Sequence, residues 1–297
     1  MNWFILALIA LLCWSGSDLF SKMGSRPNDQ YSHWKMVMVV GVVMGLHAIY
    51  MLAIGTPFQL RDILTYMPAS VLYIAAMVFG YVGLRYIELS VSSPICNSSG
   101  AVAAVLCFLV LGDTMTGLQL FAVSLVCVAV FGLGWLEKKQ NDRALAAEGQ
   151  VPDRKYTRSF WAITLPLLYC LLDGLGTFAD AFLLDTVIAE ESANIAYELT
   201  FLFLAIASFV YVVIIKKQKL TLPAEGPKAI AAVCETAGQF AYIYAIGANA
   251  IVAAPMISSY CMFSVLWSRL FLKEKLSAKH YAVIALAVVG IAILGME

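Results

Sequence analysis

The chain consists of long apolar stretches separated by short polar breaks. A bilayer core about 30 Å thick needs roughly 20 apolar residues to be crossed by one helix, and the pattern predicts ten such helices. They cover about residues 3–23, 33–54, 64–86, 92–111, 118–136, 160–184, 193–215, 227–246, 250–272 and 279–296. The longest polar connection divides an all-α integral membrane protein into a first five-span repeat, 1–136, a cytoplasmic linker, 137–159, and a second five-span repeat, 160–297.

Composition supports this class. Of 297 residues, 62% are hydrophobic and only 13% are charged, whereas soluble domains average about 25% charged. A net charge of zero gives no argument for a nucleic-acid partner. The cysteines all fall in apolar runs without a metal or redox spacing, so neither a metal nor a cofactor is expected.

The positively charged residues predict the orientation. Connections after spans 1, 3, 5, 7 and 9, with the adjoining helix ends, hold eighteen of the nineteen Lys and Arg, and the other side holds only Arg61. Because positively charged loops stay in the cytoplasm, both termini should be extracytoplasmic. We expect a multi-pass protein of the plasma or bacterial inner membrane. The first span lacks a basic start and carries Asp18, which is untypical of a cleaved signal peptide.

The second half repeats the first at an offset of 161 residues. The matches are Phe79 with Phe240, Tyr81 with Tyr242, Pro94 with Pro255, Ser98 with Ser259, Asp113 with Glu274 and Gly134 with Gly295. Since each half has an odd number of spans, the second copy enters the membrane from the opposite side. Such inverted repeats are typical of secondary transporters that work by alternating access.

Pro94 and Pro255 each open a predicted span beside polar residues, among them Asn97 and Tyr260. Proline prevents a regular helix start and frees a carbonyl, which makes these segments candidates for lining a cavity. Alternatively, both prolines lie in a first helical turn, where no hydrogen-bond donor is lost.

The chain resembles the EamA-like branch of the drug/metabolite transporter superfamily. The resemblance covers the ten short spans, the Trp14-Ser15-Gly16 sequence with Lys22 at the end of span 1, and the acidic residue after spans 4 and 9. It implies that spans 1–4 and 6–9 surround the solute pathway, and that spans 5 and 10 are peripheral and can support a homodimer. Asp18 stands where that family often has Asn, which changes the expected charge of the ligand.

Five carboxylates lie within apolar spans: Asp18, Asp173, Asp180, Glu198 and Glu235. Each ionised group facing lipid would cost roughly 2.5–3.5 kcal/mol, so they are expected to face protein or water. Span limits place Asp173 and Glu235 near the midplane, Asp180 and Glu198 toward the outside, and Asp18 toward the inside. Asp18 could instead pair with Lys22, and Asp180 and Glu198 could form hydrogen bonds across helices.

Helical spacing groups several of these residues. Glu235, Gln239 and Tyr242 share one face of span 8, and Trp14 and Asp18 share one face of span 1. Carboxylates beside aromatic rings are what recognition of an organic cation requires. The predicted solute site is therefore Glu235, Asp173, Trp14, Tyr242, Gln239, Asn97 and Tyr260.

Proton coupling or gating is assigned to Asp18, Asp180, Glu198 and His47. His47 in span 2 is a candidate proton relay, with a hydrogen-bonded packing role as the alternative. Gly41 and Gly45 are expected to allow close helix packing.

These observations predict a secondary transporter of a small organic cation or amine-bearing metabolite, such as a quaternary amine, that works by alternating access and is coupled to protons. The alternative is a transporter of neutral or zwitterionic solutes, such as an amino acid or nucleoside, in which the acids serve proton coupling. An enzyme would need a nucleophile or metal set that the motifs lack, and a receptor or scaffold would bind without net flux. The expected partners are the solute, membrane lipid and a second copy of the chain through spans 5 and 10.

Overall fold

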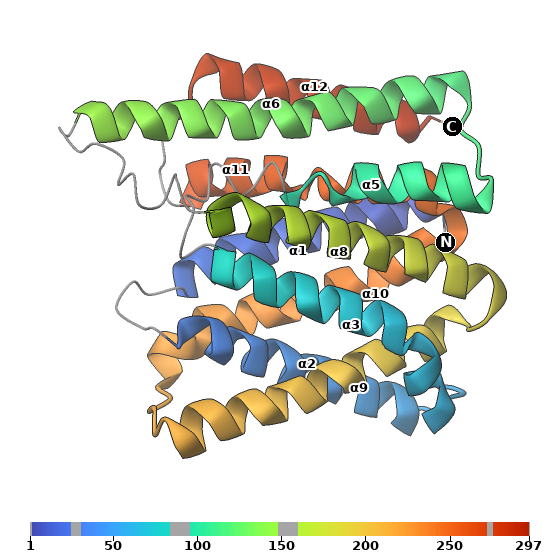
Figure 1. The fold of residues 1–297 in the computed structure, drawn as a ribbon, viewed down its shortest axis with the longest axis vertical. Helices are drawn as coiled ribbons and strands as arrows, with labels where there is room; N and C mark the ends of the chain where they lie inside the picture. The colour runs from blue at the N-terminus through green and yellow to red at the C-terminus, as the bar shows by residue number, and fades with distance from the viewer. Residues whose placement is uncertain (1, 25–30, 84–95, 148–159, 272–275, 297) are drawn as a thin grey trace. The chain divides into compact units, whose positions relative to one another are not determined.

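The computed structural model describes residues 2–24, 31–83, 96–147, 160–271 and 276–296. Within these ranges the chain forms helices and no strands. In chain order they are α1 (Trp3–Gly24), α2 (Ser32–Ala53), α3 (Leu60–Gly83), α5 (Ser99–Leu106), the π-helical η1 (Cys107–Leu111), α6 (Gly117–Ala147), α8 (Phe160–Thr186), α9 (Glu190–Phe209), the π-helical η2 (Val210–Ile215), α10 (Leu222–Ser258), α11 (Tyr260–Phe271) and α12 (Ala278–Leu294) (Figure 1). Pro94 and its neighbours lie outside the described residues.

Six of the described helical stretches are long and apolar enough to cross a membrane. Two shorter apolar stretches, Ser99–Leu111 and Ala278–Leu294, fall below that length. Helices satisfy their own backbone hydrogen bonds, which is why an apolar chain without water around it adopts them. The described part of the chain is therefore an all-helical membrane protein.

The break predicted between residues 246 and 250 coincides with a kink in α10, where Asn249 has non-helical backbone (φ −164°, ψ 76°). Pro255 lies six residues after this kink, inside the second part of α10, and does not open it. The end of α6 differs from the expectation, because the helix continues to Ala147 and the start of the predicted linker is helical. A run of charged helix formers escapes a reading based on hydropathy.

Packing divides the chain into two compact units, one of residues 1–70 and 182–248 and the other of residues 71–181 and 249–297. Each unit takes segments from both sequence halves, and the chain passes from one to the other inside α3, α8 and α10. The division into sequence repeats stays a prediction.

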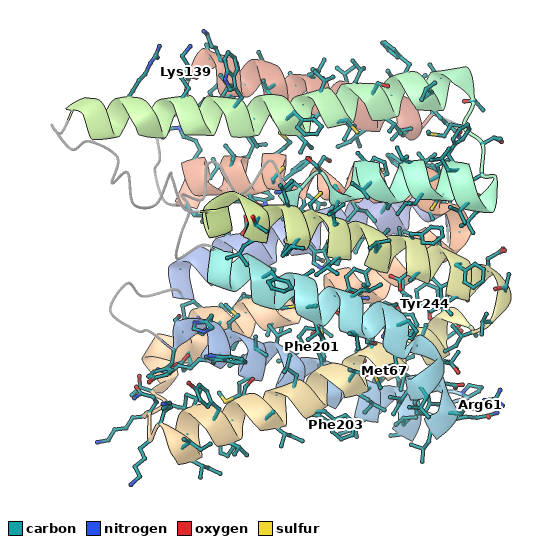
Figure 2. All side chains as sticks on the ribbon, in the orientation of Figure 1. Arg61, Met67, Lys139, Phe201, Phe203 and Tyr244 are labelled. Carbon is teal, nitrogen blue, oxygen red and sulfur yellow. The ribbon has the colours of Figure 1, made fainter. Side chains whose placement is uncertain are left out.

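The first unit is built on the close pairing of α2 with α9 (Figure 1). A Cβ at Gly41 would overlap the carbonyl oxygen of Phe201, and one at Gly45 would lie 2.7 Å from Leu202. The absence of side chains at Gly41 and Gly45 lets the backbones approach, which confirms the packing role predicted for them. Phe201, on this contact, is buried, whereas Phe203 on the opposite side of α9 is 64% exposed (Figure 2).

The second unit contains the pairing of α6 with α12. A Cβ at Gly290 would lie 2.9 Å from the carbonyl oxygen of Ala122. A buried cluster joins these helices to α11, through Ala129, Val130, Leu133, Cys261, Met262, Val265, Ile284 and Ala287. Helices α6 and α12 correspond to predicted spans 5 and 10, and in the described chain they pack against each other.

Candidate functional site

Helices α1 and α10 of the first unit lie in close contact because two glycines omit side chains between them. A Cβ at Gly16 of α1 would lie 3.5 Å from Sγ of Cys234 on α10. A Cβ at Gly238 of α10 would lie 2.5 Å from Cδ1 and 2.7 Å from Nε1 of Trp14. Gly238 therefore makes the space that the indole of Trp14 occupies.

One helical turn beyond Gly238, the ring of Tyr242 meets the same indole. The ring centroids of Trp14 and Tyr242 are 5.0 Å apart, with an angle of 34° between the planes. Tyr242 is buried and Trp14 half-buried. The structure thus brings together the two rings that the sequence assigned to one site, and they pack against each other.

The same region of α10 carries a carboxylate and an amide. Glu235 follows Cys234, which faces Gly16 of α1, and it is half-buried. It is the one charged residue of the α10 sequence between Ala229 and Ala248. Gln239 is 4% exposed, and its Nε2 has no hydrogen-bond partner among the described residues. We define the α1–α10 site as Trp14, Glu235, Gln239 and Tyr242.

Asp18 lies on α1 one turn after Trp14 and is half-buried. The structure does not describe the side chain of Lys22, so the alternative that Asp18 pairs with Lys22 stays untested.

The remaining residues of the predicted solute site, Asp173, Asn97 and Tyr260, belong to the second unit. There the side chain of Asp173 on α8 forms a hydrogen bond with Ser99 at the start of α5. A Cβ at Gly174 would lie 3.0 Å from the carbonyl oxygen of Ser99, so this glycine lets α8 approach the backbone of α5. Asn97 and Tyr260 are half-buried.

Asp180 of the second unit is a fully enclosed carboxylate, with no exposed surface. The hydroxyl of Tyr73 on α3 donates to its Oδ2 at 2.6 Å and lies 3.2 Å from Oγ1 of Thr177. The sequence analysis gave a hydrogen bond across helices as an alternative role for Asp180, but it did not identify Tyr73 as the partner. Only the folding of α3 against α8 brings these distant positions together.

Glu198 and His47 form a pair within the first unit. Nδ1 of His47 lies 2.8 Å and 2.9 Å from the two carboxylate oxygens of Glu198. Glu198 is fully buried, whereas the side chain of His47 is 27% exposed. The ring of His47 also meets the edge of Phe240 on α10 at 5.5 Å. The sequence had named both residues but had not paired them.

A buried ionic cluster that the sequence reading missed connects α2 with the start of α10. Nζ of Lys228 lies 2.7 Å from Glu225, and Nζ of Lys35 lies 4.0 Å from the same carboxylate. Lys228 is only 1% exposed. Hydropathy placed both lysines at cytoplasmic span ends, where long side chains usually extend to water.

The described side chains were compared with the donor sets that metal ions need. In the described ranges, no group of three or more His, Cys, Asp or Glu side chains could hold a metal ion.

The long apolar helices and the polar groups buried among them define a multi-pass membrane protein. The sequence model of the EamA-like transporter family matches residues 1–135 and 160–296. The chain belongs to the EamA-like transporter family, and it is a membrane transporter.

Solved structures show the same fold. One, titled only as the crystal structure of a protein, superposes with a TM-score of 0.71 at 12% sequence identity, covering 99% of this chain and 96% of that chain. At this identity the likeness shows the fold alone. A comparison with curated proteins found no match.

Proposed function

We propose that the chain is a secondary transporter of a small organic cation, such as a quaternary amine. The observation that carries this proposal is the ring pair of Trp14 and Tyr242 on the helix that also bears Glu235. Ring faces attract a cation by about 0.5–2 kcal/mol, more strongly when water is excluded. A carboxylate one to two turns away supplies the opposite charge. The α1–α10 site therefore suits a compact cation with apolar substituents.

The proposed mechanism is proton-coupled alternating access by ten helices in two inverted repeats. The stretch Glu225–Phe271 is 47 residues long and contains the break at Asn249. Because one crossing needs roughly 20 residues, this stretch has the length of two crossings, which supports the higher helix count. The driving force would be a proton gradient, since the buried carboxylates are groups that can exchange protons.

The proposed orientation has both termini outside the cytoplasm. It rests on the lysine and arginine distribution and on the positive-inside rule. We also propose a homodimer through α6 and α12, whose outer faces carry large exposed apolar side chains, among them Phe121, Phe131 and Val289. Disulfide cross-linking between single cysteines introduced there tests the dimer.

Uptake by proteoliposomes tests the solute. The purified protein should accumulate radiolabelled choline in preference to a labelled neutral amino acid or nucleoside. Glu235→Gln preserves the shape of the side chain and removes its charge, so choline uptake should fall at least about tenfold, the factor that corresponds to 1.4 kcal/mol. The matched control is Glu190→Gln, the same replacement at the first turn of α9, which should transport normally.

Two results would contradict the proposal. Uptake of an amino acid or nucleoside without choline uptake would favour the neutral-solute alternative. Unchanged choline uptake by Glu235→Gln would remove Glu235 from the site.

A further inference from the structure

The pair of His47 and Glu198 lies beside a close approach of α2 and α9. Gly41 and Gly45 allow this approach on α2, and Phe201, one turn after Glu198, packs against Gly41. Glu198 is fully enclosed, and the imidazole of His47 faces both of its oxygens. A buried carboxylate without a compensating charge is strongly unfavourable.

The chemistry of the pair differs from that of Asp180. Asp180 accepts a hydrogen bond from the hydroxyl of Tyr73, a neutral donor. The partner of Glu198 is an imidazole, the one side chain whose charge changes in the physiological range. A charged imidazole makes the pair neutral overall, and a neutral imidazole leaves one buried negative charge. The packing of α2 on α9 therefore responds to one proton.

The imidazole of His47 is the accessible member of the pair, because 27% of its side chain is exposed whereas Glu198 is fully buried. A proton that enters the pair from outside therefore meets the imidazole first.

The same contact connects the pair to the solute site. Phe240, which meets the ring of His47, is the residue directly after Gln239 of the α1–α10 site. A change in the charge and packing of His47 thus acts on the helix segment that carries Gln239, Glu235 and Tyr242.

We infer that His47 and Glu198 form the binding site of the coupling proton, separate from the α1–α10 solute site. This inference rests on the proposed function. With the carboxylate ionised, Nδ1 donates its hydrogen to Glu198. A proton from water adds to Nε2 of His47, where it forms an N–H bond, and release returns it to water.

Helices α2, α9 and α10, which pack around His47, carry other titratable groups. They are His33, Lys35 and Tyr50 on α2, Glu190, Glu191 and Tyr197 on α9, and Glu225, Lys228, Cys234, Glu235, Tyr242 and Tyr244 on the part of α10 in this unit. Tyr244 packs on Phe240, with the ring centroids 5.1 Å apart, and its hydroxyl interacts with Glu191.

The test separates proton-driven accumulation from simple exchange, using labelled choline in proteoliposomes. His47→Asn retains an amide donor near the position of Nδ1 but cannot take up a proton, and Glu198→Gln removes the carboxylate. A gradient of about one pH unit can drive about tenfold accumulation in one-to-one coupling. Both variants should lose this accumulation and should retain choline exchange at equal pH within about twofold, which also shows that they are folded. His33→Asn is the matched control on the same helix.

The outcomes distinguish this inference from the proposed function. Gradient-driven accumulation that persists in both variants overturns the inference and leaves the cation transporter intact. Wild-type choline transport that does not depend on the pH gradient also overturns the inference and leaves the cation transporter intact. If the wild type transports no choline, the solute proposal fails, and the inference is judged by nuclear magnetic resonance of the protein labelled with ¹⁵N-histidine.

In that experiment the signal of His47 is the one that disappears from the spectrum of the His47→Asn variant. It should respond to pH, and the midpoint of that response should change in Glu198→Gln. A His47 signal that does not respond to pH overturns the inference.

Discussion

The hydroxyl of Tyr73 lies 2.6 Å from Oδ2 of Asp180, and this hydrogen bond joins α3 to α8 within the second unit. Asp180 has no exposed surface, so its carboxylate relies on nearby donors such as this hydroxyl. The contribution of each side chain to stability therefore depends on the other, although the two are more than a hundred residues apart in the chain.

Tyr73→Phe should destabilise the protein by about 1–3 kcal/mol, because it removes a donor from a buried carboxylate. The loss is measured by thermal unfolding in detergent. Tyr50→Phe is the control, since Tyr50 is 60% exposed, and it should have little effect. In the double variant Tyr73→Phe/Asp180→Asn the two losses should not add. Additive losses would show that the two side chains act independently.

Gly238→Ala should displace the indole of Trp14. The new Cβ would lie 2.5 Å from Cδ1 of that ring, and overpacking of this kind costs about 1–3 kcal/mol. Thermal unfolding and choline binding should both be impaired. Gly226→Ala on the same helix, with no atom within 4 Å of the new Cβ, should change neither. Shortening the ring partner in Gly238→Ala/Trp14→Leu should restore stability without restoring binding.

The ring of Tyr242 should contribute to cation affinity through its face. Tyr242→Phe keeps that face and should bind choline nearly as well as the wild type. Tyr242→Leu should lose about 0.5–2 kcal/mol of binding free energy, measured by isothermal titration. Phe203→Leu removes a lipid-exposed ring of α9 and serves as the control. Equal affinity of Tyr242→Leu and the wild type would place the cation elsewhere.

The orientation is tested with fusion reporters. Alkaline phosphatase attached after Glu297 should be active and a green fluorescent protein in its place dark, because the positive-inside rule places this end outside the cytoplasm. The same reporters inserted at Gln150 should behave in the opposite way. Matching signals at the two positions would contradict an odd number of crossings between them.

Much of the candidate site could be predicted from the spacing of its residues along the sequence. Glu235, Gln239 and Tyr242 share a helix face because side chains three and four apart in a helix are neighbours. Trp14 was assigned to the same site for its aromatic character, and the structure brings its ring to Tyr242. Local periodicity carries such information because it depends only on helix geometry.

Partners from different helices could not be predicted in the same way. The sequence named His47 and Glu198 as separate candidates, and it did not identify Tyr73 as a partner of Asp180. Their pairing depends on which helices pack and at what height, and that depends on glycines such as Gly41 and Gly174 whose neighbours are far away in the chain.

The sequence by itself determined the class of protein and the helices. The apolar content and the lengths of the apolar runs leave helices as the form in which such a chain can satisfy its backbone in a membrane, and the family follows from the residues along nearly the whole chain. The tertiary structure decided which buried polar groups neutralise one another. Hydrogen bonds and charge pairs act over a few ångströms, and only the packing of distant helices brings two side chains within that distance.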